Sequence, residues 1–155
     1  DRSVSRGLGD VYKRQIWEHW DGMKDDGSMW SADMNSFNHY AYGAIGEWMY
    51  RAMAGIEADP EHPGFKHAIL YPRIGGNLKY TAGKYHSIYG DVGVKWEVQG
   101  KQITLTVQIP VNTTAEIRLD QAKAVLESDG LTFTREADYM AAEAGSGTYH
   151  IAFEQ

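Results

Sequence analysis

The chain has 155 residues, of which 43% are apolar and 12% aromatic, so it is long enough to bury a substantial core. Five tryptophans, ten tyrosines and four phenylalanines exclude a disordered chain, and the absence of cysteine excludes disulfides and thiolate chemistry. With 15 basic and 21 acidic residues, scattered basic charges and no membrane-length apolar run, the chain is expected to bind neither nucleic acid nor a membrane.

Residues 1–15 differ in composition from the rest of the chain. They carry four basic and two acidic residues without a usable apolar period. The string VSRGLGDVYKRQ within them resembles translated adapter sequence found at the ends of fragments assembled from environmental DNA. We therefore expect a non-native tail over 1–15 and exclude it from fold reasoning.

The next segment, 16–34, combines acidic and indole side chains. Five carboxylates stand there against one lysine, and Glu18 lies between Trp17 and Trp20. This composition suits a sugar-binding cleft, because carboxylates accept hydroxyl protons and indole faces cover sugar C–H groups. An acidic surface loop over an aromatic core explains it as well. Glu18 is a candidate for general acid or base catalysis.

A helix is predicted next, from apolar residues spaced i, i+3, i+4, i+7 between Phe37 and Ala52. Asn35 or Ser36 is the expected N-cap, and Gly55 stands where a left-handed C-cap belongs. The helix is apolar on most of its circumference, so we expect neighbours to bury it on several sides.

Beyond a proline-containing linker at 59–64, the apolar period changes to two. Alternation over 92–98 and 103–109 predicts two strands joined by a turn at 99–102. Weaker strands are predicted at Lys66–Leu70, Leu78–Tyr85, Ala115–Leu119, Ala124–Glu127, Leu131–Thr134 and Thr148–Phe153. These strands predict an antiparallel β-sandwich with Val94, Trp96, Leu105 and Val107 inside. Phosphate-binding glycine motifs and metal-ligand spacings are absent, so no cofactor or metal is expected.

Three strings carry a resemblance to a known family: WEHW at 17–20, MNSFNHYAYGAIGEWMYRAMAGI at 34–56 and PGFKHAILYPRIGG at 63–76. They resemble the C-terminal part of bacterial α-L-rhamnosidases of glycoside hydrolase family 78. The resemblance implies an α+β fragment, with the terminal helix of an (α/α)6 barrel in residues 16–58 and an antiparallel β-sandwich in residues 64–155.

The activity implied is inverting hydrolysis of terminal α-L-rhamnose from glycosides. In such enzymes one carboxylic acid protonates the leaving oxygen, and a carboxylate about 6.5–9.5 Å away activates water on the opposite face. By motif match, Glu18 falls on the general base, and His39 falls on a histidine that contacts the sugar. Trp17 and Trp20 are the accompanying substrate-binding candidates. The general acid is implied to lie upstream of this chain, and His19 departs from the arginine common at its position.

The resemblance also implies two partners, which are a rhamnose-containing glycoside and the missing N-terminal part of the same catalytic domain. The chain alone is expected to be inactive, and its compartment stays open between bacterial cytoplasm and periplasm or secretion. Two alternatives remain at this point. One is the tail of another (α/α)6 glycosidase. The other is a non-catalytic carbohydrate-binding or structural β-module, in which Tyr80, Tyr85 and Tyr89 stack on sugar.

Overall fold

The structure is a computed structural model that describes residues 17–19, 21–33 and 36–155. The chain divides into two units, Asp1–Gly46 and Glu47–Gln155, and each is described by itself. The tail predicted over 1–15 lies outside the described residues. The boundaries predicted for the other two parts, 16–58 and 64–155, stay a prediction.

The predicted helix is present as three consecutive segments, which are α2 (Tyr40–Gly43), α3 (Ile45–Trp48) and the π-helix η1 (Met49–Ala54). The backbone stays in the right-handed helical region at Ala44, between α2 and α3, and at Trp48, before η1. Gly55 ends the helical segment with a φ of 73°, as predicted. Among the described residues, no helix has the length and apolar character that crossing a membrane requires.

The start of this helical segment differs from the prediction. His39 is the N-cap of α2, so the helix begins three residues later than expected. The prediction of Ser36 as N-cap was therefore wrong, and Asn35 lies outside the described residues. The backbone of Ser36 is instead engaged by another segment, which is described with the site below.

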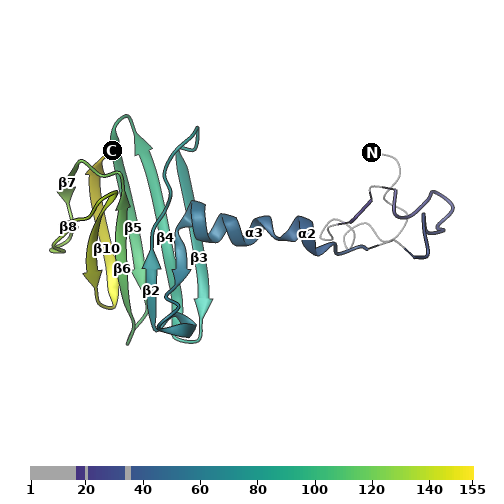
Figure 1. Cartoon of the computed structure of the whole chain (residues 1–155), viewed down its shortest axis with the longest axis horizontal. Helices are drawn as coiled ribbons and strands as arrows, with labels where there is room; N and C mark the ends of the chain where they lie inside the picture. Colours follow the sequence, from purple (N-terminus) through teal and green to yellow (C-terminus); the bar gives the residue numbers. More distant parts are fainter. Residues whose placement is uncertain (1–16, 20, 34–35) are drawn as a thin grey trace. The chain divides into compact units, whose positions relative to one another are not determined.

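The described part of Glu47–Gln155 forms two five-stranded sheets (Figure 1). The first sheet has the order β1-β2-β6-β9-β8, and the second has the order β3-β4-β5-β10-β7. The strands are β1 (Ile56–Ala58), β2 (His67–Leu70), β3 (Tyr80–Ser87), β4 (Gly90–Gln99), β5 (Gln102–Ile109), β6 (Thr114–Asp120), β7 (Ala124–Glu127), β8 (Thr134–Arg135), β9 (Tyr139–Ala144) and β10 (Gly147–Glu154). A short 3₁₀ helix, η2 (Pro63–Phe65), precedes β2.

The predicted sandwich is confirmed, with three differences. The pair β2–β6 is parallel, so the first sheet is mixed rather than wholly antiparallel. The strand predicted at Leu131–Thr134 was wrong, because β8 covers only Thr134–Arg135. The strands β1 and β9 were not predicted. The first is only three residues long, and β9 is rich in alanine, which has a weak strand preference.

The core lies between the two sheets and draws large apolar residues from both. Val94, Trp96, Leu105 and Val107 on the second sheet are at most 2% exposed, as predicted. Ile117 and Leu119 on β6 face them from the first sheet and are equally buried. This alternation of buried and exposed residues fixes the strand register, because a one-residue slip would turn every core side chain to solvent.

The π-helix η1 packs closely on the second sheet. The Trp96 indole N–H donates a hydrogen bond to the Met53 carbonyl over 2.8 Å. At Gly83 on β3 a Cβ atom would lie 2.6 Å from the Ala54 Cβ, so only glycine permits this approach. A hydrogen bond therefore holds this junction together, and the lack of a side chain at Gly83 allows η1 to lie this close to β3.

Gly83→Ala is expected to destabilise the protein by about 1–3 kcal/mol, because the added methyl overpacks against Ala54. The matched control is Gly93→Ala on β4, where the new Cβ would lie 3.4 Å from the Gln108 Cβ. The control should shift the free energy of unfolding by no more than about 0.5 kcal/mol. Urea unfolding measures both values, and equal stability of the two variants would contradict the close approach of η1 to β3.

Three aspartates form pairs with histidines on the surface of the sandwich; Asp129 is exposed, whereas Asp59 and Asp91 are half-buried. Asp59 accepts from the His62 side chain and Asp91 from the His86 side chain, whereas the backbone N–H of His150 donates to Asp129 over 2.7 Å. These hydrogen bonds lower the pKa of each carboxyl below the ordinary aspartate value of 3.8.

The lowered pKa values predict a loss of stability in acid. A carboxyl whose pKa is lower in the folded state stabilises above the unfolded value of 3.8, and that contribution is lost as pH falls through the folded pKa. The melting temperature of the triple variant Asp59→Asn, Asp91→Asn, Asp129→Asn should therefore fall less steeply below about pH 4. Parallel melting curves against pH for the variant and the parent chain would contradict this.

Candidate active site

A backbone hydrogen bond brings the two sequence-predicted catalytic and sugar-contacting residues together. The N–H of Glu18 donates to the Ser36 carbonyl over 2.8 Å. This contact places the Glu18 backbone beside the segment that leads into α2. His39, three residues after Ser36, is thereby brought to the same place.

The segment between these residues folds into a compact turn. A bridge pairs Met23 with Met29, and the Trp30 N–H donates to the Gly22 carbonyl over 3.1 Å. At the tip, the Asp26 carboxylate accepts from the hydroxyl of Ser28 over 2.6 Å and from its N–H over 2.9 Å. The hydroxyl and the N–H of Ser28 lower the pKa of Asp26. The Asp-Gly-Ser string at 26–28 is typical of such turns and would have predicted this one.

The side chains of Glu18 and His39 face each other. The Glu18 Oε1 lies 3.7 Å from the His39 Nε2, a separation longer than a direct hydrogen bond. Both side chains are partly exposed, at 23% for Glu18 and 33% for His39. A carboxylate and an imidazole in this arrangement can accept and donate hydrogen bonds to one small hydroxylated molecule.

His39 also differs in one respect from the sequence-based expectation. It was expected within the first turn of a long helix, whose terminus would favour an anion at Glu18. His39 is instead the N-cap of α2, one residue before the first helical turn. The proximity of the two side chains depends on the Glu18–Ser36 backbone contact.

The two described tryptophans of this segment, Trp17 and Trp30, each pack against a different ring. The Trp17 ring packs edge-on against Phe37, with 4.9 Å between the ring centroids. Trp20 lies outside the described residues. The partly exposed Trp30, which sequence reasoning did not single out, lies against the His19 ring at a centroid distance of 4.5 Å. Trp30 stands at the end of the turn, and its contact with His19 could have been found only from the fold of the loop.

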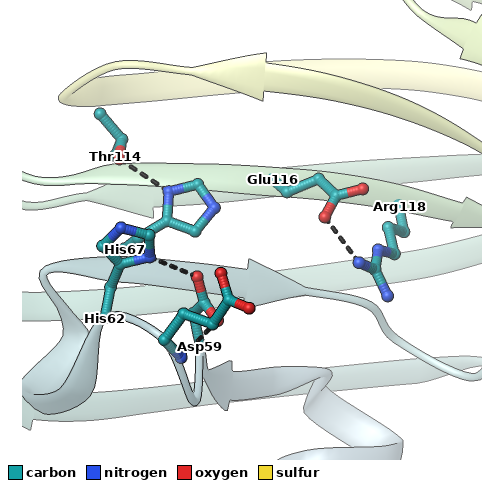
Figure 2. A network of polar contacts seen from close by, with 7 residues as sticks. Asp59, His62, His67, Thr114, Glu116 and Arg118 are labelled. Atoms are coloured by element: carbon teal, nitrogen blue, oxygen red, sulfur yellow. Dashed lines mark hydrogen bonds and ion pairs between the residues drawn. The ribbon is translucent and has the colours of Figure 1, made fainter.

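A second polar cluster lies on the outer side of the first sheet. Figure 2 shows His62 against Asp59, and beside them His67, which shares a 2.7 Å hydrogen bond with Thr114 of β6. Further along β6, Arg118 donates to Glu116, a contact that raises the pKa of Arg118 (Figure 2). Within the described ranges, no group of three or more His, Cys, Asp or Glu side chains is arranged to hold a metal ion.

Two family models match the chain in consecutive stretches. The bacterial α-L-rhamnosidase 6 hairpin glycosidase domain matches residues 13–53, which include Glu18 and His39. The bacterial α-L-rhamnosidase C-terminal domain matches residues 55–133, which include most of the sandwich. The fold and these matches define a chain in which the end of a six-hairpin glycosidase domain is followed by a β-sandwich. The chain belongs to the bacterial α-L-rhamnosidase family.

Individual relatives agree with the family matches. An α-L-rhamnosidase of Streptomyces avermitilis is 39% identical over 139 residues, which cover 88% of this chain and 13% of that protein. One of Formosa agariphila is 38% identical over 121 residues, covering 77% of this chain and 13% of that protein. The crystal structure of the S. avermitilis α-L-rhamnosidase complexed with L-rhamnose superimposes with a TM-score of 0.72 at 37% identity, over 88% of this chain and 13% of that one. The chain thus spans about an eighth of the length of these relatives.

Proposed function

We propose that this chain supplies the general-base side of the active site of an inverting α-L-rhamnosidase. The observation that carries the proposal is the 3.7 Å approach of Glu18 to His39 within the stretch matched by the six-hairpin glycosidase domain. At one partly exposed site, a carboxylate can accept a proton from a water molecule and an imidazole can hydrogen-bond to a sugar hydroxyl.

Glu18 acts on the attacking water in this proposal. A carboxylate that is 23% exposed can reach a water molecule, and the backbone contact with Ser36 holds it in a fixed position. Inversion needs a second carboxyl about 6.5–9.5 Å away, because the water must fit between the base and the sugar. The part of the relatives' length that this chain does not span supplies that general acid.

His39 and the nearby indoles bind the sugar. The His39 imidazole offers ring nitrogens that donate to or accept from a rhamnose hydroxyl. Trp17, whose edge contacts Phe37, supports this binding and forms part of the wall of the site. Trp20 has the same role by the motif match given above.

The rest of the six-hairpin domain is the proposed partner of the helical segment. Tyr40 and Ile45 are 87% and 57% exposed, and Trp48 and Met49 are also exposed. Large apolar side chains gathered on one short segment are usually covered by another part of a protein. The matched stretch ends at residue 53, so these residues belong to the helical domain, and its other helices bury them in the complete enzyme.

Glu18→Gln is expected to lower kcat by about 100-fold or more, because glutamine keeps the size of the side chain but cannot take a proton from water. The measurement uses a chimera in which the matching residues of this chain replace their counterparts in the S. avermitilis relative. KM and the melting temperature should change little. Asp25→Asn, at an exposed acid in the same segment, is the matched control and should keep full activity. A Glu18→Gln chimera that keeps most of its kcat would remove Glu18 from the mechanism.

His39→Ala in the same chimera is expected to act mainly on binding. Loss of one hydrogen bond to a neutral hydroxyl costs about 0.5–1.5 kcal/mol, which corresponds to a rise of about 2- to 13-fold in KM. Steady-state kinetics with an aryl α-L-rhamnoside separate KM from kcat. A fall in kcat as large as that of Glu18→Gln, at unchanged KM, would contradict a binding role for His39.

The 155-residue chain by itself is expected to hydrolyse no rhamnoside, because it lacks the proposed general acid, whose contribution is about 10²–10⁴-fold, and most of the substrate site. Release of an aryl chromophore over the uncatalysed background measures this. If the isolated chain hydrolyses the rhamnoside and its Glu18→Gln variant does not, a complete active site lies within these residues. That result would overturn the proposal that the general acid lies outside this chain.

A further inference from the structure

One edge of the sandwich carries an open groove that the proposed hydrolysis does not use. The strands β1 and β3 stand at the ends of the two sheet orders, and η1 contacts both of them, so they border the same edge. In Figure 1 the end of the helical segment meets the sandwich beside β3. The groove has a volume of about 470 Å³ and is lined by residues of the helical segment, β1, η2 and β3. All of its lining residues belong to the Glu47–Gln155 unit.

The groove is present because η1 closes only part of this edge. At Gly83 a Cβ atom would meet the side chains of Ala54 and Ile56, so this part of the inner face of β3 is covered. Tyr85 is two residues further along the same face of β3, and it is 42% exposed. The half-buried Phe65 at the end of η2 packs against it, with 4.4 Å between the ring centroids. Beyond η1, the inner face of this edge strand therefore ends in an aromatic pair that borders an open groove.

The walls of the groove are mainly apolar. Tyr50 on η1 is 47% exposed and stands across from the Phe65–Tyr85 pair, with Ile56 between them on β1. On the helical side the Arg51 guanidinium lies 3.2 Å from the Glu47 carboxylate. An exposed ion pair of this kind contributes little to binding, so burial of the aromatic walls is the main gain when the groove is filled.

The family matches indicate what fills the groove. Tyr50 and Arg51 lie in the stretch matched by the six-hairpin domain, whereas Phe65 and Tyr85 lie in the stretch matched by the C-terminal domain. A segment in the groove therefore contacts both domains. Tyr50 also directly follows the exposed apolar residues 48 and 49, which the proposed function assigns to the interface with the other helices of the six-hairpin domain. The groove continues that apolar surface onto the sandwich.

We propose that a segment of the six-hairpin domain from outside these 155 residues docks in this groove. The proposal rests on the proposed function, which makes the rest of that domain the partner of the helical segment. This chain spans 13% of the S. avermitilis relative, so most of such a protein is a source for the segment. The docked segment places apolar side chains against Tyr50, Phe65 and Tyr85, and it joins the catalytic domain to the sandwich at a second place besides η1.

Maleimide labelling of single introduced thiols tests the proposal, because the chain has no cysteine of its own. Tyr85→Cys is labelled in the isolated chain and in the chimera described above, and labelling of the chimera without an introduced thiol is subtracted. The introduced thiol should react at least about tenfold more slowly in the chimera, because the docked segment must open before the reagent enters. Tyr80→Cys, on the same strand but outside the groove, is the matched control and should react at the same rate in both proteins.

Three further variants make the result decisive. Ile45→Cys reports on the helical segment alone, so protection there without protection of Tyr85→Cys would overturn this inference and leave the proposed partner of the helical segment standing. Protection of neither thiol would overturn both. Glu57→Cys probes the β1 wall of the groove and decides the result should Tyr85→Cys unfold.

The same assay tests whether a second copy of the chain fills the groove. Protection of Tyr85→Cys in the isolated chain that increases with protein concentration would show such a copy and would overturn the proposal. No hydrolysis is measured, so failure of this inference leaves the proposed role of Glu18 untouched.

Discussion

The hydrogen bond from the Trp96 indole to the Met53 carbonyl joins two parts of the molecule that the family matches treat separately. The six-hairpin match ends at residue 53 and the C-terminal-domain match begins at residue 55. Trp96 is fully buried in the sandwich core, so the end of η1 is attached directly to that core. The Tyr71 N–H adds a second attachment by donating to the Gly55 carbonyl over 2.8 Å.

This junction constrains the sequence on both sides. Gly55 has a left-handed φ of 73°, and a side chain there would collide with Pro72. Both the backbone conformation and the close contact therefore require glycine at this position. Gly83 performs the corresponding function on β3, where Ala54 approaches. Because η1 is attached so closely, the sandwich can support the end of the helical segment. In the proposed function, the exposed apolar side chains of that segment are covered by the rest of the six-hairpin domain.

The parts of the fold that follow local patterns could be predicted from the sequence. The β4–β5 hairpin alternates strictly, and burial of Trp96 and Leu105 follows from that alternation. The parallel β2–β6 pair could not be predicted, because the two strands are separated by β3, β4 and β5 and no local pattern encodes a crossover. The site shows the same limit. Residue types and the family resemblance singled out Glu18, but its approach to His39 depends on a non-local backbone hydrogen bond to Ser36.

In the proposed mechanism, Glu18 activates water while His39 holds the sugar. A crystal structure of the chimera with bound L-rhamnose tests this most directly. We expect the Glu18 carboxylate within hydrogen-bonding distance of a water next to the anomeric carbon, with the His39 imidazole on a ring hydroxyl. A rhamnose bound elsewhere, or a Glu18 side chain turned away from the anomeric carbon while His39 contacts the ring, would contradict it.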